Sequence, residues 1–150
     1  MAALFSFKEK TEEINMIELL NVLPQTVAVN GNVLFTSTAV HSGRCERHRD
    51  GSGVLTLTAP GRYLIGFSGN IAVPTGETVG EVSLGIALDG EILPGSTMRV
   101  TPAAVEEYFN VATTHYVDVY CSCCVSISVK NAGETPVLVD NPNLTAVRVA

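Results

Sequence analysis

The sequence predicts an all-β domain, a sandwich of antiparallel strands, and one long stretch carries most of this prediction. In Val54–Val73 the apolar residues fall on one parity after the turn at Pro60-Gly61, which is typical of a strand with one buried face. Tyr63, Ile65 and Phe67 are the core positions that this alternation predicts. The segments beyond residue 26 all favour strands, without helices between them, so a parallel α/β sheet is excluded.

Turn residues mark the other expected strands. Asn30-Gly31 is a tight-turn signal, and Asp89-Gly90 is the preferred turn of a hairpin. Tyr116–Val129 is too long for one ordinary strand, so we expect a turn near Ser122. The pattern predicts about eight to ten strands, most simply a jelly-roll sandwich, and the remaining ones are Val33–Val40, Val82–Leu88 with Glu91–Leu93, a strand within Gly95–Thr114, and two last strands joined by Asn141-Pro142.

The first 25 residues differ from the rest. Ser6 and Glu9 fit a capping box, and helix-forming residues follow until Pro24, so we expect a short helix or an extended arm. An isolated short helix is marginal in water, so the segment needs something to pack on. We divide the chain into an attachment arm, 1–25, and a head, 26–150, with a simple N-terminal cap as the alternative. The apolar anchor candidates are Phe7, Ile14, Ile17, Leu20 and Leu23.

Composition limits the class of partner. Of the 150 residues, 46% are hydrophobic and 16% are charged, against about 25% charged in typical soluble domains. This favours an apolar surface that faces another subunit. The formal net charge of −6 argues against a general nucleic-acid binder. The sequence has neither an uninterrupted apolar run of membrane-spanning length nor a secretory signal, so we expect synthesis in the cytoplasm.

One short segment reverses the acidic balance. From His41 to Asp50 the chain reads HSGRCERHRD. The segment is either a solvated loop or a docking patch for an acidic or glycan surface. The candidate contact residues are His41, Arg44, Arg47, His48 and Arg49.

Signatures of chemistry are weak throughout. Cys45 with His48 and the pair Cys121 and Cys123 lack the spacing of zinc ligands, so we expect buried thiols, no metal site and no cofactor. The three histidines stand in no nucleophile context, and we expect no enzymatic activity. Asp89-Gly90 and Asp140-Asn141 could hold calcium, yet a turn role explains both without a cation.

Two stretches carry a family resemblance. Ala59–Phe67, APGRYLIGF, resembles the Pro-Gly-x-Tyr strand of the tumour necrosis factor and complement globular-head superfamily. Val125–Val149, with SISVKN and the closing NLTAVRVA, is similar to the end of that superfamily's bacterial branch, which includes heads of collagen-like spore-surface glycoproteins and of some phage proteins.

The resemblance implies a ten-stranded jelly roll that assembles as a homotrimer and acts as a binding or structural module. Since an arm stands where a collagen-like stalk would be, it implies a virion component with the arm on a protein shell, at the virion surface. The alternative is a receptor- or glycan-binding head of a fibre or of a spore or cell surface. Neither reading involves nucleic acid.

Overall fold

The computed structural model describes residues 14–120 and 124–150, and every regular element in these ranges is a β-strand. The strands are β1 Met16–Leu20, β2 Gln25–Val27, β3 Ser37–Ser42, β4 Glu46–His48, β5 Leu55–Leu57, β6 Gly61–Ala72, β7 Val82–Leu88, β8 Glu91–Ile92, β9 Met98–Val100, β10 Phe109–Val119, β11 Val125–Asn131 and β12 Val137–Arg148.

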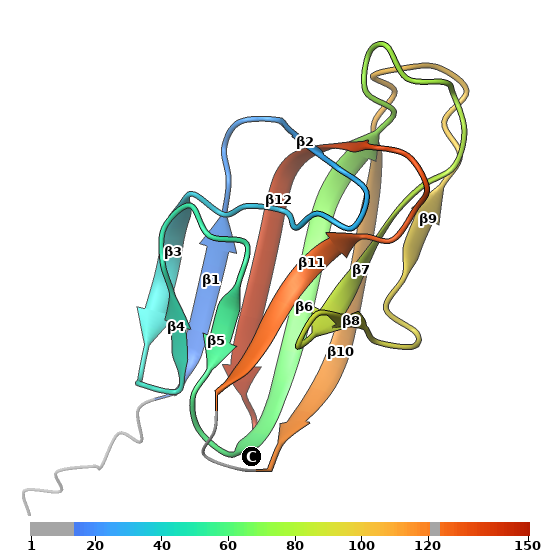
Figure 1. The fold of residues 1–150 in the computed structure, drawn as a ribbon. Coiled ribbons are helices and arrows are strands. Elements are labelled where there is room, and N and C mark those ends of the chain that lie inside the picture. Colours follow the sequence, from blue (N-terminus) through green and yellow to red (C-terminus); the bar gives the residue numbers. More distant parts are fainter. Residues whose placement is uncertain (1–13, 121–123) are drawn as a thin grey trace, which may run out of the picture.

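The strands form two antiparallel sheets that face each other (Figure 1). The first sheet has the order β10-β6-β12-β1-β3, with β2 paired to β12. The second has the order β4-β5-β11-β7-β8, with β9 paired to β7. Strands that are neighbours in a sheet are mostly distant in sequence, as in a jelly roll. The predicted all-β sandwich is therefore confirmed.

The core lies between the sheets and follows the predicted alternation. On β6, Tyr63, Ile65 and Phe67 are at most 3% exposed, while Arg62 points outward and is exposed. The opposite layer of the core comes from the second sheet, chiefly Leu55 and Ile127. Each of these large side chains contributes about 1.5–3 kcal/mol on burial, so this contact is the main source of stability.

The prediction of an N-terminal helix is wrong for the part of the segment that the structure describes. Met16–Leu20 is strand β1, hydrogen-bonded between β12 and β3, and the segment before Met16 is described only from residue 14. Ile17 and Leu19 are inward and buried. Tertiary pairing thus outweighs helix propensity here, since an amphipathic strand in mid-sheet buries both a side-chain face and its backbone. The predicted capping box lies outside the described residues.

The turn predictions have mixed outcomes. Asp89-Gly90 turns β7 into β8 with φ of 49° and 88°, as predicted. The predicted strand in Gly95–Thr114 is present as the start of β10, and β10 and β11 end and begin on either side of the expected break, although Ser122 itself lies outside the described residues. Asn30-Gly31 is a turn, but the strand that follows starts only at Ser37, because 33–36 crosses toward the second sheet.

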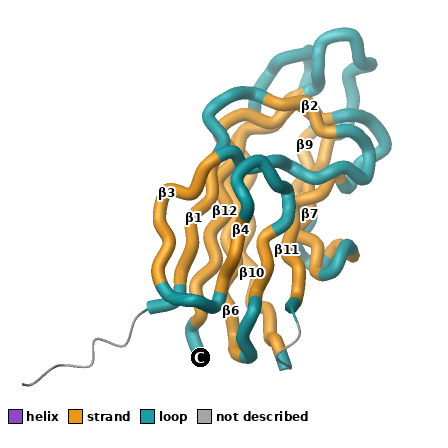
Figure 2. Tube along the Cα trace, turned by 60° about the vertical axis from the view of Figure 1, so that its left-hand side comes forward, coloured by secondary structure: helices purple, strands orange, loops and turns teal. Residues whose placement is uncertain are grey.

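The last two predicted strands, joined by Asn141-Pro142, form a single strand in the structure. β12 runs from Val137 to Arg148, and its pairing with β6 shifts register between Asp140 and Asn143. Asn141 takes a φ of 49°, so the chain makes a bulge there. The bulge accommodates Pro142, which has no N–H to give to a neighbouring strand. The end of β12 and the start of the described chain lie at the same end of the sandwich, which we call the base (Figure 2).

Candidate functional site

The outward face of the first sheet carries an apolar row near the base. The register places Tyr116, Leu64, Val147 and Met16 side by side on β10, β6, β12 and β1. Directly opposed residues of neighbouring strands share one face, so these side chains form a continuous strip. Tyr116 is 64% exposed in the single chain.

Small side chains form the next two rows of the same face. Thr114, Gly66 and Thr145 lie side by side, and Ala112, Ser68 and Asn143 follow toward the middle of the sheet. Above them is a shallow groove of about 420 Å³. A Cβ at Gly66 would lie 2.9 Å from the Thr145 hydroxyl oxygen, so no larger residue fits without movement. Such a low, flat surface allows another backbone to approach closely.

Charges on this face are few. They are Glu18 in the threonine row, Asp140 opposite Asn70, and Arg62 with Asp118, opposed at the base of β6 and β10. The last two form a two-pronged pair, with Arg62 Nε donating to Asp118 Oδ1 at 2.7 Å and Nη2 donating to Oδ2 at 3.0 Å. The Arg62 guanidinium holds the pKa of Asp118 below its usual range. The two charges neutralise each other and leave this part of the face close to neutral.

The basic segment is only partly a loop, although one interpretation expected a loop throughout. His41 and Ser42 end β3, at the edge of the first sheet, and Glu46–His48 is β4, at the edge of the second. The turn between them crosses one edge of the sandwich. The His48 side chain has no exposed area and lies inside, with Nε2 2.8 Å from the Ser52 carbonyl oxygen and its ring edge-on to Phe35.

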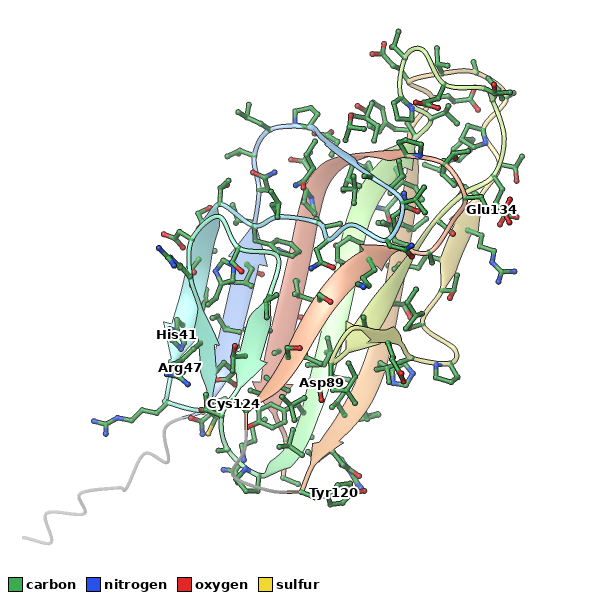
Figure 3. The ribbon with its side chains drawn as sticks, in the orientation of Figure 1. His41, Arg47, Asp89, Tyr120, Cys124 and Glu134 are labelled. Atoms are coloured by element: carbon green, nitrogen blue, oxygen red, sulfur yellow. The ribbon has the colours of Figure 1, made fainter. Side chains whose placement is uncertain are left out.

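The remaining candidates of the basic segment are exposed. His41 Nε2 is 3.0 Å from the Glu46 carbonyl oxygen, and Arg44 occupies the turn. Arg47 and Arg49 point outward from the second sheet, and Arg47 Nη2 donates to Cys124 Sγ at 3.6 Å (Figure 3). The surface of the segment is therefore made of its arginines and His41, without His48.

The inward side of β4 carries a buried carboxyl group, that of Glu46. Glu46 is 0% exposed, and neither of its carboxylate oxygens has a hydrogen-bond partner in the described part of the chain. Burial raises its pKa to about 7, although Arg148 opposes the shift. Tyr63 lies near enough that its own pKa, raised to about 12 mainly by burial, responds to Glu46. Sequence inspection missed this group.

The cysteines divide between interior and surface. Cys45 is buried, as predicted, but Cys124, directly before β11, is exposed; Cys121 and Cys123 lie outside the described residues. Within residues 14–120 and 124–150, no three His, Cys, Asp or Glu side chains gather as metal ligands. Asp89 has the expected place in the turn between β7 and β8, and its Oδ1 also accepts hydrogen bonds from the N–H and hydroxyl of Ser126 on β11.

The anchor candidates do not form one surface. Ile17 belongs to the core and Leu20 is half-buried on β1, whereas Ile14 and Leu23 are exposed at opposite ends of that strand. Phe7 lies outside the described residues. β1 pairs with β12 and β3 within the first sheet, although the predicted arm, 1–25, includes it. No helix in the described ranges is long and apolar enough to cross a membrane.

The exposed row of the first sheet was also missed at the sequence level. Ala112, Thr114, Tyr116 and Asp118 alternate with buried residues, so their parity is visible in the sequence. Their neighbours on β6, β12 and β1 are about 30 to 100 residues away in sequence, and only the register brings them together.

Neither a protein-family model nor a curated protein sequence matches the chain. Its fold, however, is similar to solved structures. The globular domain of a zebrafish complement 1qA protein gives a TM-score of 0.63 at 12% identity, covering 91% of this chain and 98% of that one. Murine APRIL at pH 5.0 gives 0.64 at 12% identity, with 91% and 99% covered. The PRD1 vertex protein P5 gives 0.51 at 16% identity, with 91% and 97% covered.

These similarities define the class of fold. The chain is a jelly-roll sandwich like the heads of the tumour necrosis factor and complement superfamily, and a vertex protein shares the architecture. At such low identity the likeness concerns the fold alone.

Proposed function

We propose that the chain is a non-enzymatic structural protein, a jelly-roll head that forms a homotrimer and is displayed on a virion. The single observation that supports the homotrimer is the outward face of the first sheet. It joins an apolar row ending in Tyr116 to two rows of small side chains, and its charges are few: the Arg62–Asp118 pair, Glu18 and Asp140. Water is a poor partner for such a face, and in a three-fold ring a different surface of the next copy would cover it.

The virion role has weaker support. One of the similar folds is a vertex protein, and the described chain begins at the base of the head, so the residues before it leave from one end. We assign attachment to residues before Met16, with Phe7 and Ile14 as the remaining anchor candidates. A protein shell is the partner that this arrangement serves.

Light scattering of three proteins tests the proposal. The wild type should have three times the 15.9 kDa chain mass at micromolar concentration. Tyr116→Arg should be monomeric and folded, because the side chain is exposed in the chain and a buried unpaired charge opposes association. A chain lacking residues 1–13 should stay trimeric but lose co-sedimentation with particles.

Val79→Arg is the matched control for charge and exposure, since Val79 is 42% exposed on the loop between β6 and β7. This variant should remain trimeric. A monomeric wild type would reject the homotrimer. A truncated chain that still sediments with particles would reject the attachment role.

The second candidate function is a receptor- or glycan-binding head. The observation that favours it is the row of arginines exposed at the edge of the second sheet, on a chain with a formal net charge of −6. The two functions are compatible, because the arginines and the self-association face belong to different sheets.

A further inference from the structure

A groove runs along the outward side of β4 and β5. Arg47 lies directly opposite Thr56 in the register of these strands. Arg49 and Val54 follow and precede the paired residues of β4 and β5 and line the same space. With Ser52 and His48, whose side chain points inward, these residues line about 450 Å³. We call this space the arginine groove.

The arginine groove has a positive charge without an internal counter-charge. None of its lining residues is acidic. In the described part of the chain, the side-chain ion pairs of arginine are those of Arg62 with Asp118 and Arg99 with Glu81, and neither groove arginine takes part in one. Asp50, next to Arg49 in sequence, faces Thr38 and His48, and Glu46, next to Arg47, is buried on the inward side of β4. Arg47 Nη2 donates to Cys124 Sγ, and the other N–H groups of the two guanidinium groups can bind an external oxyanion.

The other lining groups suit a sugar. The Ser52 hydroxyl oxygen accepts a hydrogen bond from the Val54 N–H at 3.0 Å, which leaves its own proton to donate. Thr56 adds a second hydroxyl, and the exposed methyl groups of Val54 offer an apolar patch. A pyranose ring presents both hydroxyl groups and an apolar C–H surface, and the volume lies in the range of about 300–1,000 Å³ of small-ligand sites.

We infer that the arginine groove binds a carboxylated sugar, its carboxylate between Arg47 and Arg49 and its hydroxyl groups toward Thr56 and Ser52. This inference rests on the second candidate function and names the ligand class and the residues of that site. Of the candidate residues in the basic segment, the inferred site keeps only Arg47 and Arg49. It adds Ser52, Val54 and Thr56, which lie outside that segment.

The test is an NMR titration with four probes: N-acetylneuraminic acid, glucuronic acid, glucose and acetate. Both acidic sugars should shift the signals of Arg47, Arg49 and Thr56. Glucose should shift none, and acetate should bind at least about tenfold more weakly than the sugars because it lacks the hydroxyl contacts. Arg47→Gln and Arg49→Gln should each weaken sugar binding about tenfold, the loss expected for a charged hydrogen bond.

Arg44→Gln is the matched control, because Arg44 is exposed, has the same charge and lies outside the groove. It should change affinity less than about twofold. If Arg44→Gln lost as much sugar affinity as the groove variants, binding would come from diffuse electrostatic attraction, and the inference of a specific site would be rejected. Acetate binding as tight as the sugars, tighter binding of a hexaglutamate peptide, or no binding by either sugar would each overturn the inference.

The mass measurement separates the two functions. Failure to bind sugar in a protein of trimeric mass rejects the groove and the glycan reading but leaves the homotrimer. Sugar binding by a protein of monomeric mass would reject the homotrimer but leave the groove and the glycan-binding function.

Discussion

β6 and β4 follow the same alternation but differ on both sides. The inward residues of β6, Tyr63, Ile65 and Phe67, are apolar or aromatic, whereas those of β4 are Glu46 and His48. The outward residues of β6 beyond Arg62 are small or apolar, whereas those around β4 are arginines. β6 lies within its sheet and β4 at an edge. Inward-facing residues are therefore buried in both strands. Within the sheet these buried residues are apolar or aromatic, whereas at the edge they include a carboxyl group and an imidazole.

The outward sides of the two sheets differ in chemistry. The first sheet presents a flat face with few charges, whereas the second presents two arginines beside hydroxyl groups. Neither property disturbs the shared core, because the side chains concerned point away from it.

The largest expected effect concerns the inward side of β4. The folded state holds the Glu46 pKa at about 7, above its ordinary value of 4.5, so the folded chain keeps a proton that the unfolded chain releases. Stability from this group is complete below pH 4.5 and is lost as the pH rises to about 7. The loss is about 3 kcal/mol, from 1.36 kcal/mol per pKa unit.

Urea unfolding of the wild type and of Glu46→Gln at pH 4 and pH 8 measures this effect. The amide cannot ionise, so the variant should lack about 3 kcal/mol of the loss that the wild type shows. Comparing the two proteins cancels the titration of all other groups. Equal losses in both would mean that Glu46 is paired or hydrated in solution.

A smaller effect is expected on the inward side of β6. The Tyr63 hydroxyl donates to the Ala59 carbonyl oxygen at 2.7 Å and closes the Pro60-Gly61 turn. Tyr63→Phe should lower the free energy of unfolding by about 1 kcal/mol, since Ala59 is half-buried and water can replace part of the bond. Tyr120→Phe is the control, because that side chain is 85% exposed, and it should cost almost nothing. If both variants lowered the free energy of unfolding by a similar amount, the hydrogen bond of Tyr63 to Ala59 would not be a specific source of stability.

The sequence predicted what depends on local alternation and missed what depends on pairing. The inward positions of β6 and the hairpin at Asp89-Gly90 were predictable because two-residue periodicity and turn preferences are local. β1 was mistaken for helix because Glu18, Leu19 and Leu20 are good helix formers, and its partners β12 and β3 are not visible from nearby residues.

The candidate surfaces show the same limit. The basic segment was visible as a run of arginines, but its division into inward and outward residues required β4 to be identified as a strand. Thr56 is opposite Arg47 only through the register of β4 and β5, and Val54 is known to line the same groove only from the structure. The apolar row from Tyr116 to Met16 draws on four strands, so composition could indicate that such a face exists but not where it lies.

The most direct measurement of the central claim is hydroxyl-radical labelling of Tyr116 in the wild type and in Thr114→Arg, a variant that places a charge in the middle of the outward face. In the single chain Tyr116 is 64% exposed, so the dissociated variant should label it readily. Tyr116 should be labelled several-fold more slowly in the wild type, with Val79 labelled equally in both proteins. Equal labelling of Tyr116 in the two proteins would contradict the claim that this face is covered by copies of the same chain.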